Sequence, residues 1–323
     1  MTVPTRTELT RTGLTREGTP PQPPSGRAPV ERRTSRRLGA WWIPWAFLAP
    51  ALVLFVYFKF IPMGQAFVMS FQDVQPYLGN SWVGWDNYRA LVATDEFLAA
   101  AGHTAIIAVA QTAGAVLVGF ALALLLEGQA RRLWFVRSAA FLPVVVPTAV
   151  IAELWRIIYH PTEDGLANSI LGFFLIEPSQ WINSPDTSLL SVILVGIWRD
   201  APYDMIIIIA GLVGVDRSLY EASALDGAGW VRRIRYVTLP ALRPALAILL
   251  TLAAIRAMRI FTEVYLLTNG GPNGSSEVLM TLIYRLGFER VELGVAAAGS
   301  VVLLLATIVL TLLVRSGVRK EES

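Results

Sequence analysis

Charged side chains inside long apolar stretches are the residues of this sequence that could do chemistry. They are four acidic and four basic residues, Glu153, Arg156, Arg199, Asp200, Asp204, Arg256, Arg259 and Glu263. An ionised side chain in the middle of a membrane-spanning helix costs roughly 2.5 to 3.5 kcal/mol, so these groups should face protein or water. They could line a path for a polar solute, or they could pair with one another and hold helices together. The sequence leaves both roles open for each residue.

Two of the arginines are expected at the same depth. Arg199 and Arg256 each lie about eleven residues from the outer boundary of an apolar stretch, which at ~1.5 Å per residue is ~16 Å along a helix and near the middle of a bilayer. Trp155, Trp198 and Tyr203 lie close to the charges in sequence. We therefore predict a polar centre with aromatic side chains around it.

The elements that must position these side chains are membrane-spanning helices. Of the 323 residues, 54% are hydrophobic and only 16% are charged, a composition typical of integral membrane proteins. About 20 apolar residues cross a ~30 Å hydrocarbon layer as a helix, and apolar runs of this length do not alternate as barrel strands do. Six such runs predict spans at about 41–61, 103–126, 139–159, 188–214, 242–266 and 294–314. The predicted fold is an all-α polytopic membrane domain over residues 41–315.

The distribution of basic residues predicts the orientation. Nineteen of the 27 Lys and Arg residues lie in four segments, 1–40, 127–138, 214–243 and 315–323. Loops on the other side hold few, so the positive-inside rule assigns those four segments and both termini to the cytoplasm. The segments 1–40 and 316–323 are expected to be cytoplasmic tails. The first is rich in Thr, Pro and Arg, and we expect it to be disordered rather than a cleaved signal peptide.

Enzymatic chemistry finds little support in the sequence. The chain has no cysteine, which excludes disulfides, thiolate metal sites and cysteine nucleophiles. Neither of its two lysines, Lys59 and Lys320, belongs to a GxxxxGK(S/T) phosphate loop, so ATP would have to be used by another subunit. His103 and His160 lack the spacing of metal ligands and are expected to be polar residues at the membrane border. We expect no metal, no cofactor and no nucleic acid on this chain.

The polar segment 216–240 interrupts the apolar sequence. Asp216 is expected to cap a helix that extends to Asp226, because its side chain can accept from first-turn amides. Gly227 should end that helix with a positive φ, and a second short helix, 228–237, should be interrupted by Pro240. Such a bracket could insert into a groove of a soluble partner. Alternatively, it could lie on anionic lipid as an amphipathic loop.

The same segment carries a family resemblance. Glu221-Ala222-Ser223, then Gly227 after three residues, then Val237-Thr238-Leu239-Pro240 after nine, resembles the EAA loop of binding-protein-dependent ABC importer permeases. Asp226-Gly227-Ala228 matches the version found in carbohydrate permeases. The stretches FLAPALVLFVYFKFIP (47–62), WVGWDNYRALV (82–92), IWRDAPYDMIIIIAGL (197–212) and LLTNGGPNGSSEVLMTLIYRLGFE (266–289) also resemble MalF/UgpA-like sugar permeases. One departure is Thr262, where the family often has an acid.

The resemblance implies a transport subunit rather than an enzyme. It implies a coupling loop that docks in an ATPase subunit through Leu219, Glu221, Ala222, Asp226, Gly227, Ala228 and Pro240. The expected partners are a second, different permease, two ATPases that use ATP and Mg, and an extracytoplasmic solute-binding protein, in a bacterial cytoplasmic membrane. Because the eight intramembrane charges sum to zero, a neutral polyhydroxyl cargo suits them better than an anion. Candidate pathway residues are Trp155, Arg156, Trp198, Arg199, Asp200, Tyr203, Asp204, Arg256, Arg259 and Glu263.

Two other classes of function were weighed. An ion-coupled secondary transporter could also use intramembrane charges as ion relays, but it should show internal repeats with matching broken helices, and none is evident. A membrane scaffold or a polytopic transferase is less favoured because no catalytic constellation exists. The particular sugar is open, since maltodextrin, trehalose, cellobiose, amino-sugar and glycerol-phosphate importers share these motifs.

Overall fold

The computed structural model describes residues 42–75, 77, 79–127 and 134–320. The chain divides into two units, residues 1–54 and residues 55–323. The described part of the first unit is helical and belongs to α1 (Trp42–Phe55), none of whose side chains is buried. The predicted tail 1–40 and the last three residues of the predicted tail 316–323 lie outside the described residues.

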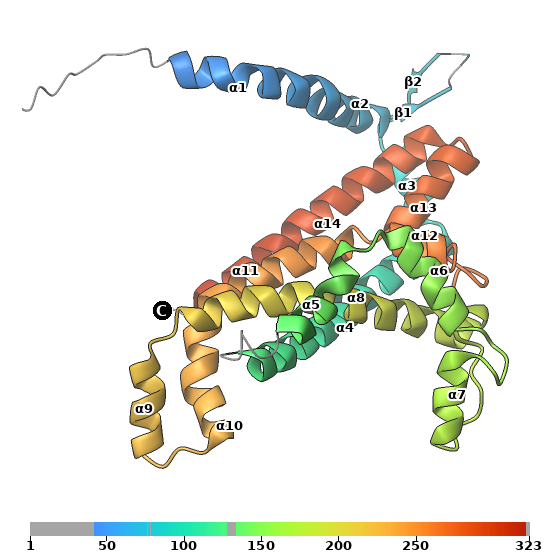
Figure 1. Cartoon of the computed structure of the whole chain (residues 1–323). Coiled ribbons are helices and arrows are strands. Elements are labelled where there is room, and N and C mark those ends of the chain that lie inside the picture. Colours follow the sequence, from blue (N-terminus) through green and yellow to red (C-terminus); the bar gives the residue numbers. More distant parts are fainter. Residues whose placement is uncertain (1–41, 76, 78, 128–133, 321–323) are drawn as a thin grey trace, which may run out of the picture. The chain divides into compact units, whose positions relative to one another are not determined.

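Helices dominate the second unit (Figure 1). A ladder of two residue pairs joins β1 to β2 in antiparallel fashion. The elements in chain order are η1 (Val56–Phe60), α2 (Ile61–Met69), β1 (Gln72–Asp73), β2 (Ser81–Trp82), α3 (Asp86–Val92), α4 (Asp95–Leu126), α5 (Trp134–Val145), α6 (Thr148–Ile158), α7 (Leu166–Phe173), η2 (Trp181–Asn183), α8 (Pro185–Val213), α9 (Arg217–Leu225), α10 (Trp230–Arg233), η3 (Ile234–Thr238), α11 (Leu239–Met258), α12 (Thr262–Leu267), α13 (Leu279–Tyr284), η4 (Arg285–Glu289) and α14 (Leu293–Lys320).

Several helical stretches are long and apolar enough to cross a membrane. Among the described residues, four meet both conditions: Trp42–Met69, Asp95–Leu126, Trp230–Met258 and Leu293–Gly317. The bent pair α5 and α6 would make a fifth crossing. Helix α8 has 29 residues, about 43 Å at 1.5 Å per residue, but it carries Arg199, Asp200 and Asp204. With α8 as a charged sixth span, the helices are consistent with the expected six.

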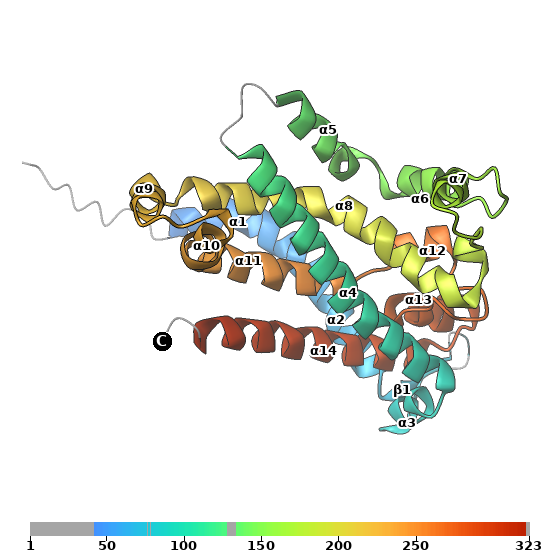
Figure 2. The ribbon, with the colours of Figure 1, turned by 90° about the horizontal axis from the view of Figure 1, so that it is seen from below.

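The residues of the predicted span at about 139–159 form two helices rather than one continuous helix. The chain bends by 103° between helices α5 and α6, and Figure 2 shows them as two segments. Pro147 accounts for the break, because its ring locks φ and disfavours helical backbone at Val146. The backbone of Pro147 is accordingly extended, with φ −57° and ψ 137°.

The predicted span 242–266 is wrong at both ends. The helix begins at Trp230 and continues through Pro240 to Met258, and Arg259 to Phe261 are not helical. Pro240 does not interrupt the chain, because the π-helical turn η3 precedes it and the N–H of Leu239 reaches back to the carbonyl of Ile234. This wider turn accommodates the missing proline donor within a continuous helix.

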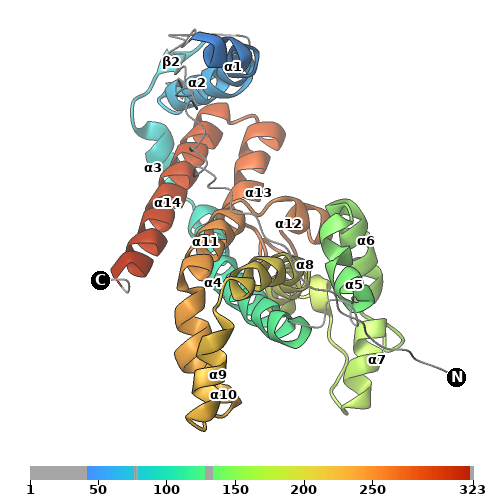
Figure 3. The same ribbon diagram turned by 60° about the vertical axis from the view of Figure 1, so that its left-hand side comes forward.

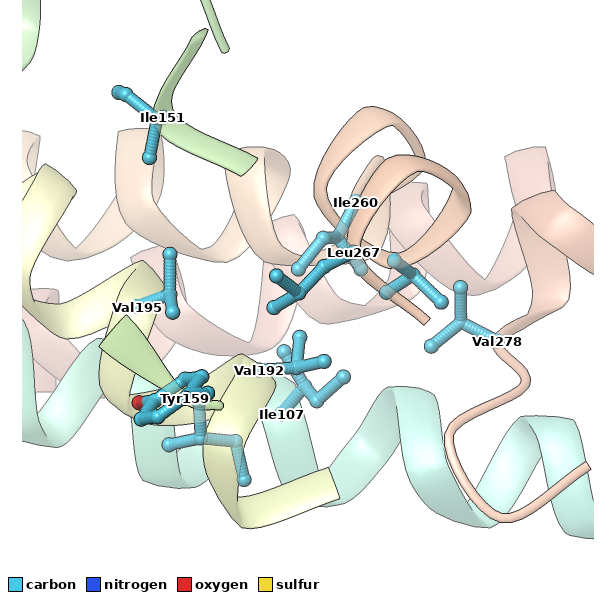
Figure 4. Close-up of a cluster of buried hydrophobic side chains, with 10 residues drawn as sticks. Ile107, Ile151, Tyr159, Val192, Val195, Ile260, Leu267 and Val278 are labelled. Atoms are coloured by element: carbon cyan, nitrogen blue, oxygen red, sulfur yellow. The ribbon is translucent and has the colours of Figure 1, made fainter. Parts of the chain in front are cut away.

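The two long helices α4 and α8 pack closely at the centre of this unit. A Cβ atom at Gly119 would lie only 2.8 Å from the carbonyl oxygen of Ala201, so only glycine allows this approach. Toward the start of α8, a buried apolar cluster joins α4, α6, α8 and α12 (Figure 4). Its members include Ile107, Ile151, Tyr159, Val192, Val195, Ile260, Leu267 and Val278. Val195 precedes Arg199 by about one helical turn, so the cluster lies directly beside the charged residues Arg199 and Asp200 of α8.

Candidate functional site

Asp200 is the centre of an ion-pair network between α8, α11 and α12. Arg199 donates from Nε and Nη2 to Oδ1 of Asp200, at 3.1 and 2.9 Å, and its Nη1 pairs with Glu263. Arg256 places its Nε 3.3 Å from Oδ2 of Asp200 and donates from Nη2 to Oδ1 of Asp204 at 2.9 Å. Both arginines therefore reach the same carboxylate, one from α8 and the other from α11.

The carboxylates of this network are deeply buried. Asp200, Asp204 and Glu263 are 6%, 1% and 8% exposed, so their negative charge requires close cationic partners. Two arginines and three carboxylates leave one net negative charge. The sequence left ion pairing and cavity lining open as alternatives. For Arg199 and Arg256 the structure shows ion pairs, and it also shows both side chains on cavity walls.

Two cavities share the wall formed by Arg199, Leu252 and Arg256. The first has a volume of about 380 Å³, and its other lining residues are Pro143, Val144, Val146, Thr148, Asp200 and Tyr203. The second has a volume of about 370 Å³ and is also lined by Gln111, Ile255, Arg259, Ile260, Phe261, Thr262 and Glu263. Both volumes are within the range of small-molecule pockets. The bend at Pro147 supplies one wall of the first cavity, and the end of α11 supplies one wall of the second.

Gln111 belongs to this centre although the sequence analysis did not select it. Its Nε2 donates to Oδ2 of Asp200 at 2.9 Å, and the residue is only 3% exposed. A lone amide within the apolar run 103–126 was the available signal, because polar side chains inside spans face partners or water. Thr148 and Phe261, which line the cavities, carried no comparable signal in the sequence.

The predicted aromatic residues separate into two groups. Tyr203 lines the first cavity, and the guanidinium carbon of Arg256 lies 5.4 Å from the centre of its ring. Trp155 and Trp198 pack edge to face, with ring centres 5.5 Å apart, and Trp155 also contacts the buried apolar cluster. Neither tryptophan is among the described residues that line the two cavities.

Arg156 and Arg259 lie apart from the network. Arg156 pairs with Glu153 at 3.4 Å on an exposed face of α6, and it donates to the carbonyl of Leu266. It therefore joins α6 to α12 rather than lining a cavity. Arg259 is exposed on the wall of the second cavity and makes no ion pair within the described part of the chain. Together with Arg259, the ion-pair network of Arg199, Arg256, Asp200, Asp204 and Glu263 has a net charge of zero, although Asp204 lines neither cavity.

Helices α9 and α10, with the turn between them and η3 after them, form a hairpin that projects from the ends of α8 and α11 (Figures 1 and 3). The side chain of Asp216 accepts from the N–H of Ser218 at 2.9 Å, which confirms the predicted cap. This hydrogen bond from Ser218 holds the pKa of the Asp216 carboxyl below its usual value. The N–H of Gly227 bonds to Ala224, the N–H of Ala228 bonds to Ser223, and Gly227 has φ +72°. These bonds form a Schellman motif, in which glycine supplies the left-handed residue.

The coupling residues predicted from the resemblance lie mostly on the surface of this hairpin. Leu219 is 50% exposed, and Glu221, Ala222, Asp226 and Pro240 are also exposed. Ala228 is an exception, because it is buried under the turn at 9% exposure. The hydroxyls of Tyr220 and Thr238, 3.1 Å apart, join α9 to η3.

Long apolar helices around a polar, cavity-lined centre define a membrane transport protein. Comparisons with known proteins agree. The chain is 34% identical to the probable ABC transporter permease protein YurN of Bacillus subtilis (strain 168), over 84% of this chain and 94% of that protein. It is 30% identical to the trehalose/maltose transport system permease protein MalF of Thermococcus litoralis, over 82% of this chain and 88% of that protein.

A solved structure has the same fold. It is a bacterial ABC transporter involved in the import of the acidic polysaccharide alginate, with a TM-score of 0.75 and 24% identity over 86% of this chain and 96% of that one. The family model described as the binding-protein-dependent transport system inner membrane component matches residues 115–320. The chain belongs to this family of ABC transporter permeases, which are membrane subunits rather than enzymes, and the ion-coupled transporter alternative is not favoured.

Proposed function

We propose that this chain forms half of the translocation pathway for a sugar or sugar derivative in an ATP-driven importer. The observation that carries this proposal is the pair of cavities that share the wall formed by Arg199, Leu252 and Arg256. They lie between the long helices of a permease. Polar and charged groups on these walls offer donors and acceptors for hydroxyl groups. Because the ion-pair network and Arg259 together have no net charge, a neutral cargo is favoured over an anion.

The proposed assembly contains a second, different permease, two ATPases that bind ATP and Mg, and an extracytoplasmic solute-binding protein. The relative from Thermococcus litoralis is named for trehalose and maltose, which supports a carbohydrate cargo here. Closure of the ATPases would draw the coupling hairpins together and open the pathway toward the binding protein. This chain supplies no catalytic group to ATP hydrolysis.

Arg259 allows a test of the pathway without disturbing an ion pair. In the complete importer reconstituted in liposomes, Arg259→Gln should lower uptake of radiolabelled trehalose or maltotriose several-fold and leave assembly and basal ATP hydrolysis intact. Arg89→Gln is the matched control, because Arg89 is an exposed arginine paired with Asp86 far from the cavities in sequence. Equal uptake by Arg259→Gln and the unaltered importer would contradict the pathway assignment.

The hairpin is proposed to dock in an ATPase subunit through Glu221 and its exposed neighbours. Glu221→Lys should lower uptake and transport-coupled ATP hydrolysis together, without lowering the amount of the permease in the membrane. Normal uptake by this variant would remove the coupling role from Glu221.

The proposed location is the bacterial cytoplasmic membrane, with both termini and the hairpin in the cytoplasm. Since the chain has no cysteine, single cysteines report on sidedness without background labelling. Asn273→Cys should react with a membrane-impermeant maleimide in intact cells, whereas Leu225→Cys, at a position that is 90% exposed, should react only after the membrane is opened. The reverse pattern would overturn the orientation.

A further inference from the structure

Four aromatic rings form a chain of contacts from the second cavity along α12, α13 and η4, in which two stacked pairs are joined by tilted and edge-on contacts. Phe261 stacks on Tyr265 with ring centres 5.2 Å apart, and both rings contact Tyr284, at 5.4 and 5.2 Å. Tyr284 in turn stacks on Phe288, with centres 5.0 Å apart and planes at 28°. Three separate elements therefore contribute to one aromatic surface.

The inner end of this chain of rings opens into the second cavity. Phe261 lines the cavity together with Arg259 and Glu263. Phe261, Tyr265 and Tyr284 are half-buried, and Phe288 at the other end is 75% exposed. Each of the four residues is thus at least partly accessible, and Phe288 is the most exposed of them.

Packing of the protein core does not account for these rings. Leu282 and Leu286, on α13 and η4, are 1% and 5% exposed and belong to the buried cluster that packs on α14. Tyr284 and Phe288 lie between and after these leucines, four residues apart, and their side chains remain accessible. The segment 279–289 therefore has two apolar sides, one used for folding and one unused in this chain. Tyr284 adds a hydroxyl group to the unused side, which makes it amphipathic.

We propose that Phe261, Tyr265, Tyr284 and Phe288 form an aromatic track on which the rings of a sugar cargo stack before they enter the second cavity. The inference rests on the proposed function. The flat faces of sugar rings carry C–H groups that pack on aromatic faces, while their hydroxyls remain free to meet polar groups such as Arg259 and the tyrosine hydroxyls. Stacking does not depend on the identity of one sugar, so the track serves ring-bearing cargo as a class.

Uptake by the complete importer tests the track. In liposomes containing the binding protein, Tyr284→Ala and Phe288→Ala should lower the trehalose or maltotriose transported per ATP hydrolysed by about three- to tenfold. The loss should be greater for maltotriose, because it contacts more of the rings at once. Tyr284→Phe, which keeps the ring and removes only the hydroxyl, should lose much less than Tyr284→Ala. Phe173→Ala is a control in which an aromatic side chain that is 84% exposed is removed from α7.

Several outcomes would overturn the track. If the rings serve only to hold the second permease or lipid, the alanine variants will lower the recovery of assembled importer while each recovered complex transports normally. If the unaltered importer takes up only sn-glycerol 3-phosphate, which has no ring, the track is also wrong. Failure to take up any member of the classes that share these motifs, maltodextrin, trehalose, cellobiose, amino sugars and glycerol phosphate, would contradict the proposed function itself.

A labelling measurement decides on the track independently of uptake. Phe288→Cys is introduced into the complete importer, and its reaction rate with a small water-soluble maleimide is measured with and without trehalose or maltotriose at high concentration. A rate at least twofold slower with either sugar, and unchanged by sn-glycerol 3-phosphate, supports the track. No protection by either sugar overturns it.

Discussion

The charged centre and the α9 hairpin are both polar, but they are built in opposite ways. The centre is buried, and its ion pairs and hydrogen bonds join α8 to α4, α11 and α12. The hairpin is exposed, and its cap and turn are closed by bonds between residues two to five positions apart. A defect in the centre should therefore disturb the whole bundle, whereas a defect in the hairpin should disturb only the hairpin and what it contacts.

The largest expected effect is at Asp200. Asp200→Ala would remove the carboxylate that Arg199 and Arg256 share and the acceptor of Gln111. Each arginine keeps one carboxylate partner, so the cost should lie at the low end of the about 3–5 kcal/mol for breaking a buried pair. We expect a marked loss of folded permease, measured as thermal stability and yield in detergent. Glu153→Gln is the control, because its exposed pair with Arg156 is worth about 0–1 kcal/mol. Equal stability of the two variants would contradict the contrast between the regions.

The next effect is at Gly227. A β-branched residue strongly disfavours φ +72°, so Gly227→Val should strain the turn by about 1–2 kcal/mol. Coupled ATP hydrolysis and uptake should fall, while the thermal stability of the bundle should not change. Gly229→Val is a matched control two residues away, because Gly229 has φ −68° and open space around it. If both valine variants behave alike, side-chain bulk rather than backbone conformation is responsible.

A smaller effect is expected at Tyr220, whose hydroxyl reaches Thr238 across the hairpin. Tyr220→Phe removes one partly buried hydrogen bond, worth about 0.5–1.5 kcal/mol. Hydrogen exchange of α9 should become faster while that of α8 remains unchanged. Faster exchange in α8 as well would show that the hairpin and the bundle are energetically linked.

The smallest effect is expected at the cap of α9. Because the hydrogen bond from Ser218 lowers the pKa of Asp216, its contribution is present above the ordinary carboxyl range and is lost only as the pH falls through the lowered pKa. Exchange protection of residues 217–221 should therefore be constant around neutral pH. Asp216→Ala should reduce this protection, and Asp216→Asn, which retains an acceptor oxygen, should reduce it less. Equal protection in all three proteins would show that the cap contributes nothing.

Local features were readable from the sequence. The cap at Asp216, the positive φ at Gly227 and the limits of α9 depend on residues within one or two turns, so the residue types alone predicted them. Long apolar runs likewise predicted membrane helices, because the bilayer imposes a minimum apolar length on each. The expected depth of Arg256 was not readable in this way, because it assumed a run extending to residue 266, whereas α11 ends at Met258.

Only the tertiary structure decided which polar groups meet. Asp200 accepts from Gln111, which is 89 residues away, and Arg199 pairs both with its neighbour Asp200 and with Glu263 of α12. Arg156 was grouped with the pathway but lies on an exposed face of α6. Sequence position specifies the depth of a side chain in a helix, but contact also depends on the rotation and crossing of the helices. The bend at Pro147, the end of α11 at Met258 and the close approach of α4 to α8 set that arrangement, and they act only once the helices have packed.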